Sequence, residues 1–246
     1  MSLFIISDLH LSFSSDKPMD RFGSMWKNHE EKIRLAWNSM VGENDTVILG
    51  GDTSWALKLR QTGEDMLYLD SLKGHKLLIK GNHDYWWDSV PKVERFLAEL
   101  GVKSVSLLQN TAFVTDSFII AGTRGWYSED EQAPEETDYE KMLAREEMRM
   151  RASLDAALFE KKKEENKDKE IIAVTHFPIV FNDFVFKALE DQIISAGVKR
   201  AFFGHIHSMF NIPRTRVENG IAHTLTSCDF LRFVPLKIEP MASEKE

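Results

Sequence analysis

Short runs of apolar residues alternate along the chain with stretches in which apolar residues recur at helical spacing. The short runs predict strands at Leu3–Ile6, Val47–Leu49, Leu77–Ile79, Val102–Leu108, Ala112–Thr115, Phe118–Ala121, Ile171–Thr175, Arg200–Phe203, Ile221–Thr226 and Phe233–Ile238. The longer stretches predict helices at Ile33–Met40, Glu64–Leu72, Val93–Leu100, Tyr139–Lys163 and Phe184–Ser195. Strands and helices that alternate in this way are typical of the α/β fold class.

Capping residues predict where three of these helices begin or end. Gly42 follows the first helix and can close it. Ser89 can cap the third helix at its start, and Gly101 stops it. Thr137 and Glu140 have the spacing of a capping box, which predicts the start of the long polar helix.

The chain length of 246 residues fits one large α/β domain better than two smaller ones. We expect that domain to span residues 1–240, with a polar tail at residues 241–246. Residues 137–166 could form a helical insertion that caps a site. The apolar fraction of 43% supplies enough side chains for a substantial core.

The charge balance and the cysteine count argue against several classes of protein. A net charge of −8 disfavours an extended surface for nucleic acid or for anionic membrane, because both need a cationic face. The single cysteine, Cys228, permits no disulfide within the chain and favours a reducing compartment. The apolar run after Met1 is too short for a signal peptide, and no stretch reaches the length of a membrane span. We therefore expect a cytoplasmic protein.

Side chains that can bind metal ions follow five of the predicted strands. They are Asp8, Asp52, Asn82, His176 and His205. In open α/β sheets, ligands bind beyond the carboxyl ends of the strands. Residues that are far apart in the sequence can therefore converge at one edge of the fold, and these five predict a common site.

Two of the sequence blocks at these positions carry carboxylates. Asp8-x-His10 places a carboxylate and an imidazole two residues apart, and in an extended segment both would point the same way. In Gly51-Asp52 the glycine allows a tight turn, after which Asp52 could bridge two cations with its two oxygens. Taken alone, each block also fits an ordinary turn that binds nothing.

The block Gly81-Asn82-His83-Asp84 combines an amide, an imidazole and a carboxylate. The carbonyl oxygen of Asn82 is a neutral ligand for a hard or borderline cation. His83 could face a substrate while Asp84 orients its ring. The same residues also fit the start of a helix or turn, with Asn82 and Asp84 as caps.

The last two blocks carry imidazoles. His176 follows a predicted strand, although a lone histidine at such a position is often structural. In Gly204-His205-x-His207 two imidazoles follow a buried strand and a glycine, which suits one metal ion or two adjacent ones.

The five blocks together resemble the signature of the calcineurin-like metallophosphoesterases. They occur in the order of that family, no signature position is missing, and they span residues 8–207. The resemblance implies an α/β fold in which a two-sheet β sandwich is flanked by helices, as α/β/β/α layers. It also implies two divalent metal ions as cofactors, with manganese expected and iron or zinc as alternatives.

The same resemblance implies a role for each residue of the blocks. One ion would be held by Asp8, His10, Asp52 and His207, and the other by Asp52, Asn82, His176 and His205. His83 would stand over the scissile phosphate without binding metal, with Asp84 behind it. The implied activity is hydrolysis of a phosphomonoester or phosphodiester by a hydroxide that bridges the two ions, with His83 stabilising charge or protonating the leaving oxygen. His29, His75, His223 and Cys228 lie outside the blocks, and we expect them to be structural.

Residues around the blocks bear on the substrate. Thr53 after Asp52, and Asp84 in place of glutamate, depart from the protein serine/threonine phosphatase branch, and the acidic balance disfavours a nuclease. We expect a small phosphorylated substrate, with a nucleotide as one candidate. Arg124 could contact a second phosphate or lie on the surface. Aromatic residues near the blocks could stack on a base or pack the core, namely Trp55, Tyr85, Trp86, Trp87, Trp126 and Tyr127.

Two other functions stay open alongside a phosphoesterase. The first is a binding scaffold on the same fold with little activity, which the complete ligand set and His83 disfavour. The second is a dinuclear hydrolase of another bond, such as an amide, which only the family analogy disfavours. The sequence leaves the oligomeric state open.

Overall fold

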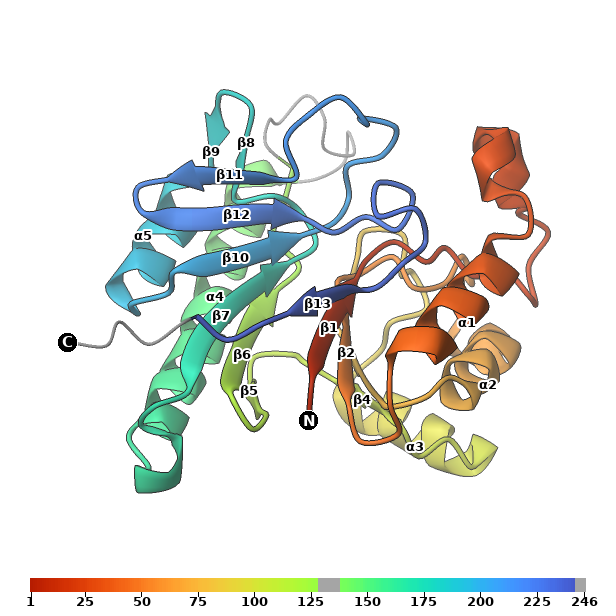
Figure 1. Cartoon of the computed structure of the whole chain (residues 1–246), viewed down its shortest axis with the longest axis horizontal. Helices are drawn as coiled ribbons and strands as arrows, with labels where there is room; N and C mark the ends of the chain where they lie inside the picture. The colour runs from red at the N-terminus through yellow and green to blue at the C-terminus, as the bar shows by residue number, and fades with distance from the viewer. Residues whose placement is uncertain (128–137, 242–246) are drawn as a thin grey trace.

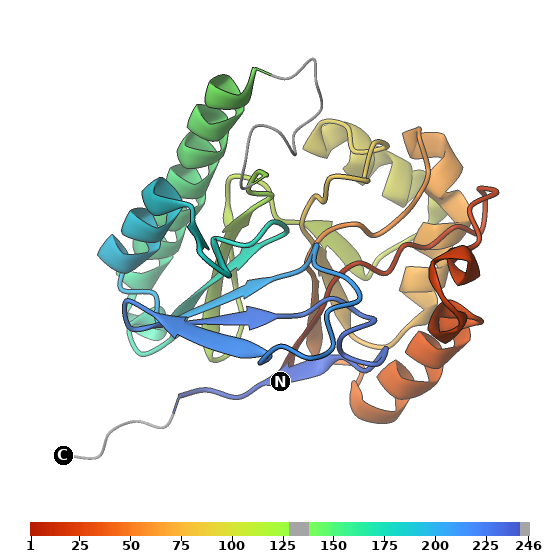
Figure 2. The same cartoon turned by 90° about the horizontal axis from the view of Figure 1, so that it is seen from above.

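Two β-sheets lie face to face, and helices cover the outer face of each one (Figure 1, Figure 2). The computed structural model describes residues 1–127 and 138–241. The first sheet contains β1 (Leu3–Ile6), β2 (Thr46–Leu49), β3 (His75–Leu78), β4 (Val105–Leu107) and β13 (Leu236–Ile238). The second contains β5 (Ala112–Val114), β6 (Phe118–Thr123), β7 (Glu170–Thr175), β10 (Arg200–Phe203), β11 (Thr215–Glu218) and β12 (Ile221–Leu225). The predicted two-sheet α/β fold is confirmed.

Most strands within each sheet are parallel, and antiparallel strands lie at one edge of the first sheet and at both edges of the second. The order in the first sheet is β13-β1-β2-β3-β4, with β13 antiparallel to β1. The order in the second sheet is β11-β12-β10-β7-β6-β5, with β11 and β5 antiparallel to their neighbours. The carboxyl ends of the parallel strands therefore gather at one edge of each sheet, where loops can present side chains.

Alternation along the strands divides the core into three layers. Leu3 and Ile5 of β1 pack between the two sheets, where they meet Ile172 and Val174 of β7. Phe4 and Ile6 point the other way, into the layer beneath the helices of the first sheet. Because successive residues of a strand face opposite sides, strands buried on both faces need apolar residues at every position.

The helices form the two outer layers. On the first sheet lie α1 (His29–Met40), α2 (Gly63–Ser71) and α3 (Val90–Leu100), and on the second lie α4 (Tyr139–Lys161) and α5 (Lys187–Ser195). Short 3-10 turns are η1 (Met19–Phe22), η2 (Ser24–Trp26), η3 (Leu59–Thr62) and η5 (Glu164–Asn166). No helix among the described residues is both long enough and apolar enough to cross a bilayer.

The long helix α4 lies along the outer face of the second sheet. Its buried side chains include Met150, Leu154 and Ala157, which share one apolar cluster with Ile119 and Ala121 of β6. Over the described part of residues 137–166, this helix therefore covers a sheet face.

Three strands are absent from the sequence-based prediction. Phe184 and Val185 do not begin a helix, because they form β9 (Phe184–Val185), which pairs with β8 (Val180–Phe181) in a hairpin. The helix α5 starts after that hairpin, at Lys187. The strand β11 was not predicted, because it is an exposed edge strand in which Val217 is the one apolar residue.

Several predicted boundaries shift by a few residues. The helix α1 begins at His29 instead of Ile33, and its C-cap residue is Val41 instead of Gly42, because Val41 is already extended, with φ at −91°. The N-cap of α4 is Asp138, whose side chain accepts a hydrogen bond from the Lys141 backbone N–H at 3.1 Å. Thr137 lies outside the described residues, as do residues 242–246 of the predicted tail. Gly101 ends α3 in the left-handed conformation as predicted, with φ at 77°.

Candidate metal centre

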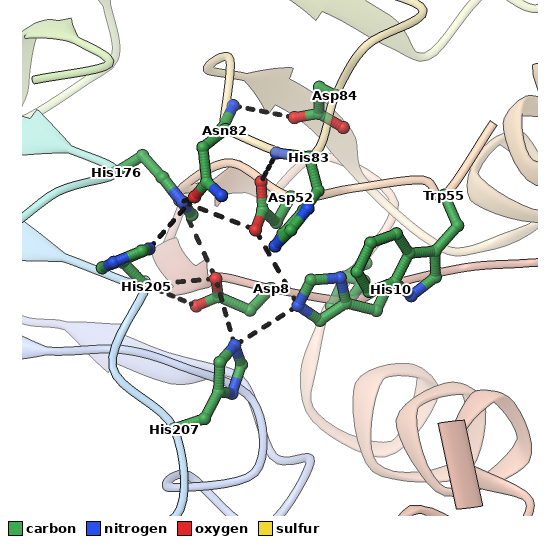
Figure 3. A network of polar contacts seen from close by, with 12 residues as sticks. Asp8, His10, Asp52, Trp55, Asn82, His83, Asp84, His176, His205 and His207 are labelled. Atoms are coloured by element: carbon green, nitrogen blue, oxygen red, sulfur yellow. Dashed lines mark hydrogen bonds and ion pairs between the residues drawn. The ribbon is translucent and has the colours of Figure 1, made fainter. Parts of the chain in front are cut away.

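Seven side chains from the five sequence blocks converge where the two sheets meet (Figure 3). They are Asp8, His10, Asp52, Asn82, His176, His205 and His207. The ligand atoms of Asp8, His10 and His207 all lie within 4.8 Å of one another, and so do those of Asp8, Asp52 and His176. Atoms that share one cation at about 2 Å lie at most about 4 Å apart, so each group needs only a small movement to hold one.

The two sheets share the cluster between them. The first sheet supplies Asp8 and His10 after β1, Asp52 after β2 and Asn82 after β3. The second sheet supplies His176 after β7, and His205 and His207 after β10. The His205 backbone N–H donates to the Asp8 carboxylate at 3.0 Å and joins the two contributions directly.

One half of the cluster is built around Asn82. Its side-chain oxygen lies 2.6 Å from His176 Nε2 and 3.0 Å from His205 Nδ1. Asp52 Oδ2 lies 3.5 Å from the same His176 nitrogen. His176 Nε2 is thus in contact with both Asn82 and Asp52, and His205 joins this half of the cluster through Asn82.

The other half is built around His207. Its Nε2 lies 3.3 Å from His10 Nε2 and 3.6 Å from Asp8 Oδ1. His10 Nε2 is in turn 3.9 Å from Asp52 Oδ2. That single carboxylate oxygen therefore contacts an imidazole nitrogen of each half, which is the position a ligand shared by two cations requires.

Four residues of the cluster have a backbone conformation that is uncommon for residues with side chains. The φ angles are 61° at Asp8, 47° at His10, 50° at Asp52 and 68° at His205. The prediction that Asp8 and His10 converge through an extended segment is therefore wrong. They converge because each of them lies in a left-handed turn. Strained conformations of this kind persist where surrounding contacts hold them, and they concentrate at functional sites.

The glycines of three blocks allow the loops to approach one another closely. A Cβ atom on Gly51 would lie 2.5 Å from His176 Nδ1, and one on Gly204 would lie 2.5 Å from Asp8 Oδ2. A Cβ atom on Gly81 would lie 2.1 Å from Asp52 Oδ1 and 2.2 Å from the Asp52 backbone nitrogen. Each glycine thus makes room for a side chain of another block, beyond the tight turn that its own block needs.

The variant Gly81→Ala is expected to lose metal and stability, because the new methyl group displaces Asp52. Overpacking of this kind lowers the free energy of unfolding by about 1–3 kcal/mol. The control is Gly63→Ala, whose Cβ would lie 4.0 Å from its nearest neighbour. Elemental analysis and denaturant unfolding of both variants measure the effect. If Gly81→Ala retained the metal content of the wild-type protein, the contact of the new methyl group with Asp52 would not limit metal binding.

Hydrogen bonds at the back of two imidazoles aim their Nε2 atoms into the cluster. His176 Nδ1 lies 3.1 Å from the Gly50 carbonyl oxygen. His207 Nδ1 lies 2.9 Å from Asp229 Oδ1. Such partners fix the tautomer and orientation of a metal-binding ring. Sequence reasoning missed Asp229, although it follows β12 as the other cluster residues follow their strands.

The carboxylate of Asp84 holds backbone groups in place. It makes no hydrogen bond to the ring of His83, so the prediction that it orients this ring is wrong. This buried carboxylate accepts hydrogen bonds from the backbone N–H groups of Thr53, Ser54 and Gly81 at 2.9, 3.2 and 2.8 Å. A fourth bond comes from Trp86 Nε1 at 2.9 Å. Asp84 therefore ties the loop that carries Asp52 to the loop that carries Asn82.

The ring of His83 stands beside the cluster without a hydrogen-bond partner among the described residues. Its centre lies 4.4 Å from the ring of Trp55 and 5.8 Å from the ring of His10. Trp55 also stacks on His10 at 4.7 Å, and Lys17 Nζ lies 4.5 Å from its ring. Trp55 thus packs against two rings of the site and is not a free platform for a base.

Burial keeps three of the four imidazoles of the cluster neutral. It lowers the pKa of His176 to about 3 and that of His205 to about 4. It also lowers the pKa of His10 well below its usual value, and the nearby His207 adds to this. Neutral imidazoles offer the lone pair that a metal ion needs.

The two carboxylates of the cluster differ in pKa. Burial alone would raise the pKa of Asp8, but the charge of His207 and a hydrogen bond with it hold that pKa below its usual value. Burial, followed by the charges of Asp84 and Asp8, raises the pKa of Asp52 well above its usual value. Burial alone would lower the pKa of His207, but the charge of Asp8 and the bond to Asp229 raise it to about 10. A proton on His207 therefore offsets the carboxylates, and a divalent cation would take the place of that proton. The donor set fits such a cation.

Arg124 lies outside the seven-residue cluster and is not a surface residue. Its side chain is 13% exposed, pairs with the buried Glu146 at 3.4 Å and covers the ring of Trp126 at 4.4 Å. Its backbone carbonyl accepts the His176 backbone N–H at 3.0 Å. Arg124 therefore borders the centre through its backbone, while its side chain enters a neighbouring cleft.

The histidines and the cysteine outside the blocks are buried or partly buried away from the seven ligand atoms. His29 Nε2 bonds to the Leu9 carbonyl at 3.0 Å, and His75 Nε2 bonds to Ser106 at 2.7 Å. His223 is buried in the second sheet. Cys228 is buried and donates to the Asp8 carbonyl at 2.9 Å, so it supports the loop of a cluster residue.

Comparisons with solved structures find the same fold at low sequence identity. The phosphopantetheinyl hydrolase of Mycobacterium tuberculosis aligns over 100% of this chain and 98% of its own, with 13% identity and a TM-score of 0.54. A protein from Thermus thermophilus aligns over 96% and 97%, with 14% identity and a TM-score of 0.51. A protein of unknown function from Aquifex aeolicus aligns over 96% and 95%, with 14% identity and a TM-score of 0.50. No curated protein sequence matches.

The comparison with family models identifies the blocks and the fold together. The model of the calcineurin-like phosphoesterases matches residues 1–209, which contain all seven cluster residues and His83. The chain belongs to the calcineurin-like phosphoesterase family.

Proposed function

We propose that the chain is a metal-dependent phosphoesterase that hydrolyses a small phosphomonoester or phosphodiester. Family membership supports phosphoester hydrolysis in general. The observation that carries the proposal is the position of Asp52 Oδ2, which lies 3.5 Å from His176 Nε2 and 3.9 Å from His10 Nε2. Two divalent cations held on either side of that oxygen would lower the pKa of water and neutralise phosphate charge.

We propose one set of ligands for each cation. Asp8, His10, Asp52 and His207 would hold one ion, and Asp52, Asn82, His176 and His205 would hold the other. We propose manganese as the preferred metal, because a donor set with several imidazoles suits it better than it suits magnesium. Residues 1–240 would act as one domain.

His83 is the proposed catalytic residue, and Asp84 is a positioning residue. The ring of His83 is free to donate a hydrogen bond to a phosphoryl or leaving oxygen. Asp84 acts through the two loops that it joins.

An apolar pocket beside the cluster suits the organic part of the ester. It has a volume of about 210 Å³, and five residues of the site line it, namely His10, Asp52, His83, His205 and His207. Met19, Phe22, Trp26 and Trp55 supply its apolar lining, and the side chain of Phe22 is exposed. These walls support a substrate whose ester group carries an apolar or ring portion next to the phosphate.

Chelation is expected to abolish hydrolysis of 4-nitrophenyl phosphate and bis(4-nitrophenyl) phosphate, and Mn²⁺ is expected to restore it better than Mg²⁺. Magnesium prefers oxygen ligands and retains its waters, whereas this cluster offers four imidazoles. Rates are measured on stripped protein with each metal added, using phosphomonoesters, cyclic nucleotides, diesters and nucleic acids. Activity that survives exhaustive chelation contradicts the proposal. Protein that binds two metal ions but hydrolyses none of these compounds is a binding scaffold.

A further inference from the structure

A second cleft lies at the ends of two strands, β3 and β6. It has a volume of about 340 Å³ and opens between the end of β3, with Lys80, and the end of β6, with Arg124. Arg149 of α4 also lines it. None of the seven cluster residues does, so the cleft is separate from the apolar pocket described above.

Three cations line this cleft, and two of them, Arg124 and Arg149, pair with one buried carboxylate. Glu146 accepts hydrogen bonds from Arg149 Nη1 at 2.5 Å and from Arg124 Nη2 at 3.4 Å. It also accepts one from Thr123 Oγ1 at 2.6 Å and one from the Gly125 backbone N–H at 3.1 Å. The carboxylate therefore has no capacity left for Lys80, whose amine has no partner among the described residues.

The other acidic residue of the cleft is already paired. Asp88 contacts Lys92 Nζ at 3.0 Å and accepts the Ser89 backbone N–H at 2.7 Å. Positive charge is therefore in excess at this position, although the whole chain carries a net charge of −8. A local excess of this kind, on an otherwise acidic protein, indicates a site for an anion.

Hydrogen-bond donors in the cleft also lack acceptors. Arg124 Nε is buried and has no partner among the described residues. Gln109 uses its side-chain oxygen to accept Trp87 Nε1 at 2.7 Å, so its amide N–H groups remain for another acceptor. Buried donors without partners destabilise a fold, and an oxyanion would satisfy several of them at once.

We propose that this cleft binds an oxyanion, of the phosphate or carboxylate type, through Lys80, Arg124 and Arg149. Lys80 is two residues before Asn82, and the Arg124 carbonyl bonds the His176 backbone N–H, so both sites rest on the same strand ends. The oxyanion is therefore either a second anionic group of the substrate or a free phosphate. The proposal that it belongs to the substrate rests on the proposed phosphoesterase function. The proposal that the cleft binds an oxyanion does not rest on that function.

Binding of inorganic phosphate to metal-stripped full-length protein tests the cleft without turnover. Phosphate bound at the cluster instead would be insensitive to substitution of Lys80 or Arg149, which lie outside the cluster, so these variants report the cleft. Wild-type protein is expected to bind one phosphate, and Lys80→Gln and Arg149→Gln are each expected to weaken binding about tenfold, as the loss of one charge-assisted hydrogen bond would. Arg145→Gln is the control, because Arg145 is exposed on the same helix outside the cleft. The proposal is overturned if the wild-type protein binds no phosphate, or if Arg145→Gln weakens phosphate binding as much as the other two variants do.

A kinetic comparison with metals restored separates the two sources. If the anion belongs to the substrate, Lys80→Gln raises KM for an aryl phosphate that carries a second phosphate about tenfold more than KM for 4-nitrophenyl phosphate. If the anion is free phosphate, binding falls in Lys80→Gln while the KM ratio equals that of wild type. Phosphate binding by the stripped protein together with no turnover on either ester contradicts the phosphoesterase proposal and supports the anion site.

Discussion

The variant Asp52→Asn is expected to lose bound metal and at least on the order of 10³-fold in activity, since activation and charge neutralisation by metal contribute several kcal/mol to such reactions. Asp52 Oδ2 lies 3.5 Å from His176 Nε2 and 3.9 Å from His10 Nε2, between the two proposed sets of ligands. An amide of the same shape removes the negative charge that separates two cations. Their mutual repulsion then opposes double occupancy.

The measurement is metal content per chain alongside turnover, and Asp65→Asn is the matched control. Asp65 is also a buried carboxylate, and burial raises its pKa to about 6. It lies outside the cluster, where it accepts hydrogen bonds from the Phe13 backbone N–H and the Ser54 hydroxyl. The control is expected to retain its metals. Full double occupancy with normal turnover in Asp52→Asn would show that this residue is not shared between two ions.

The variant His83→Ala is expected to keep both metals and lose on the order of 10²–10⁴-fold in turnover. Burial lowers the pKa of His83 and Lys17 lowers it further, so the ring is neutral near pH 7. A neutral ring still donates an N–H hydrogen bond. Its loss therefore weakens stabilisation of the transition state without removing a ligand from the cluster.

A series of leaving groups distinguishes two roles for His83. The loss of turnover shrinks for good leaving groups such as nitrophenol if His83 protonates the leaving oxygen, and stays constant if it stabilises the phosphoryl oxygens. His75→Ala is the control, because that partly buried ring bonds to Ser106 away from the cluster. If His83→Ala lost a metal ion, His83 would be a metal ligand in addition to Asn82.

The cluster could be predicted from the sequence because topology determines it. Asp8, Asp52 and His176 each follow an apolar run, and parallel strands bring such positions to one edge whatever their separation along the chain. The role of Asp84 was predicted wrongly, since adjacency to His83 in the sequence says nothing of which backbone groups a buried carboxylate meets. Asp229 was missed for the related reason that its partner, His207, lies on another loop.

Short and exposed elements were the least predictable part of the fold. Phe184 and Val185 continue the apolar pattern of α5, and only their pairing with the preceding strand shows that they form a hairpin. The cleft that we propose as an oxyanion site could not be predicted from the sequence, for a different reason. Lys80, Arg124 and Arg149 come from three separate elements, and no spacing in the sequence relates them.

The division of the cluster between two sheets has a consequence for how the protein is made. The first proposed ligand is Asp8 and the last is His207, so a chain synthesised from its N-terminus presents Asp8, His10, Asp52 and Asn82 long before the others. A cation that met this early half of the site would find one imidazole and no His176, His205 or His207. If these residues hold metal as proposed, metal capture would come late in biosynthesis, after β10 has joined the second sheet, and an incomplete chain would hold metal only weakly.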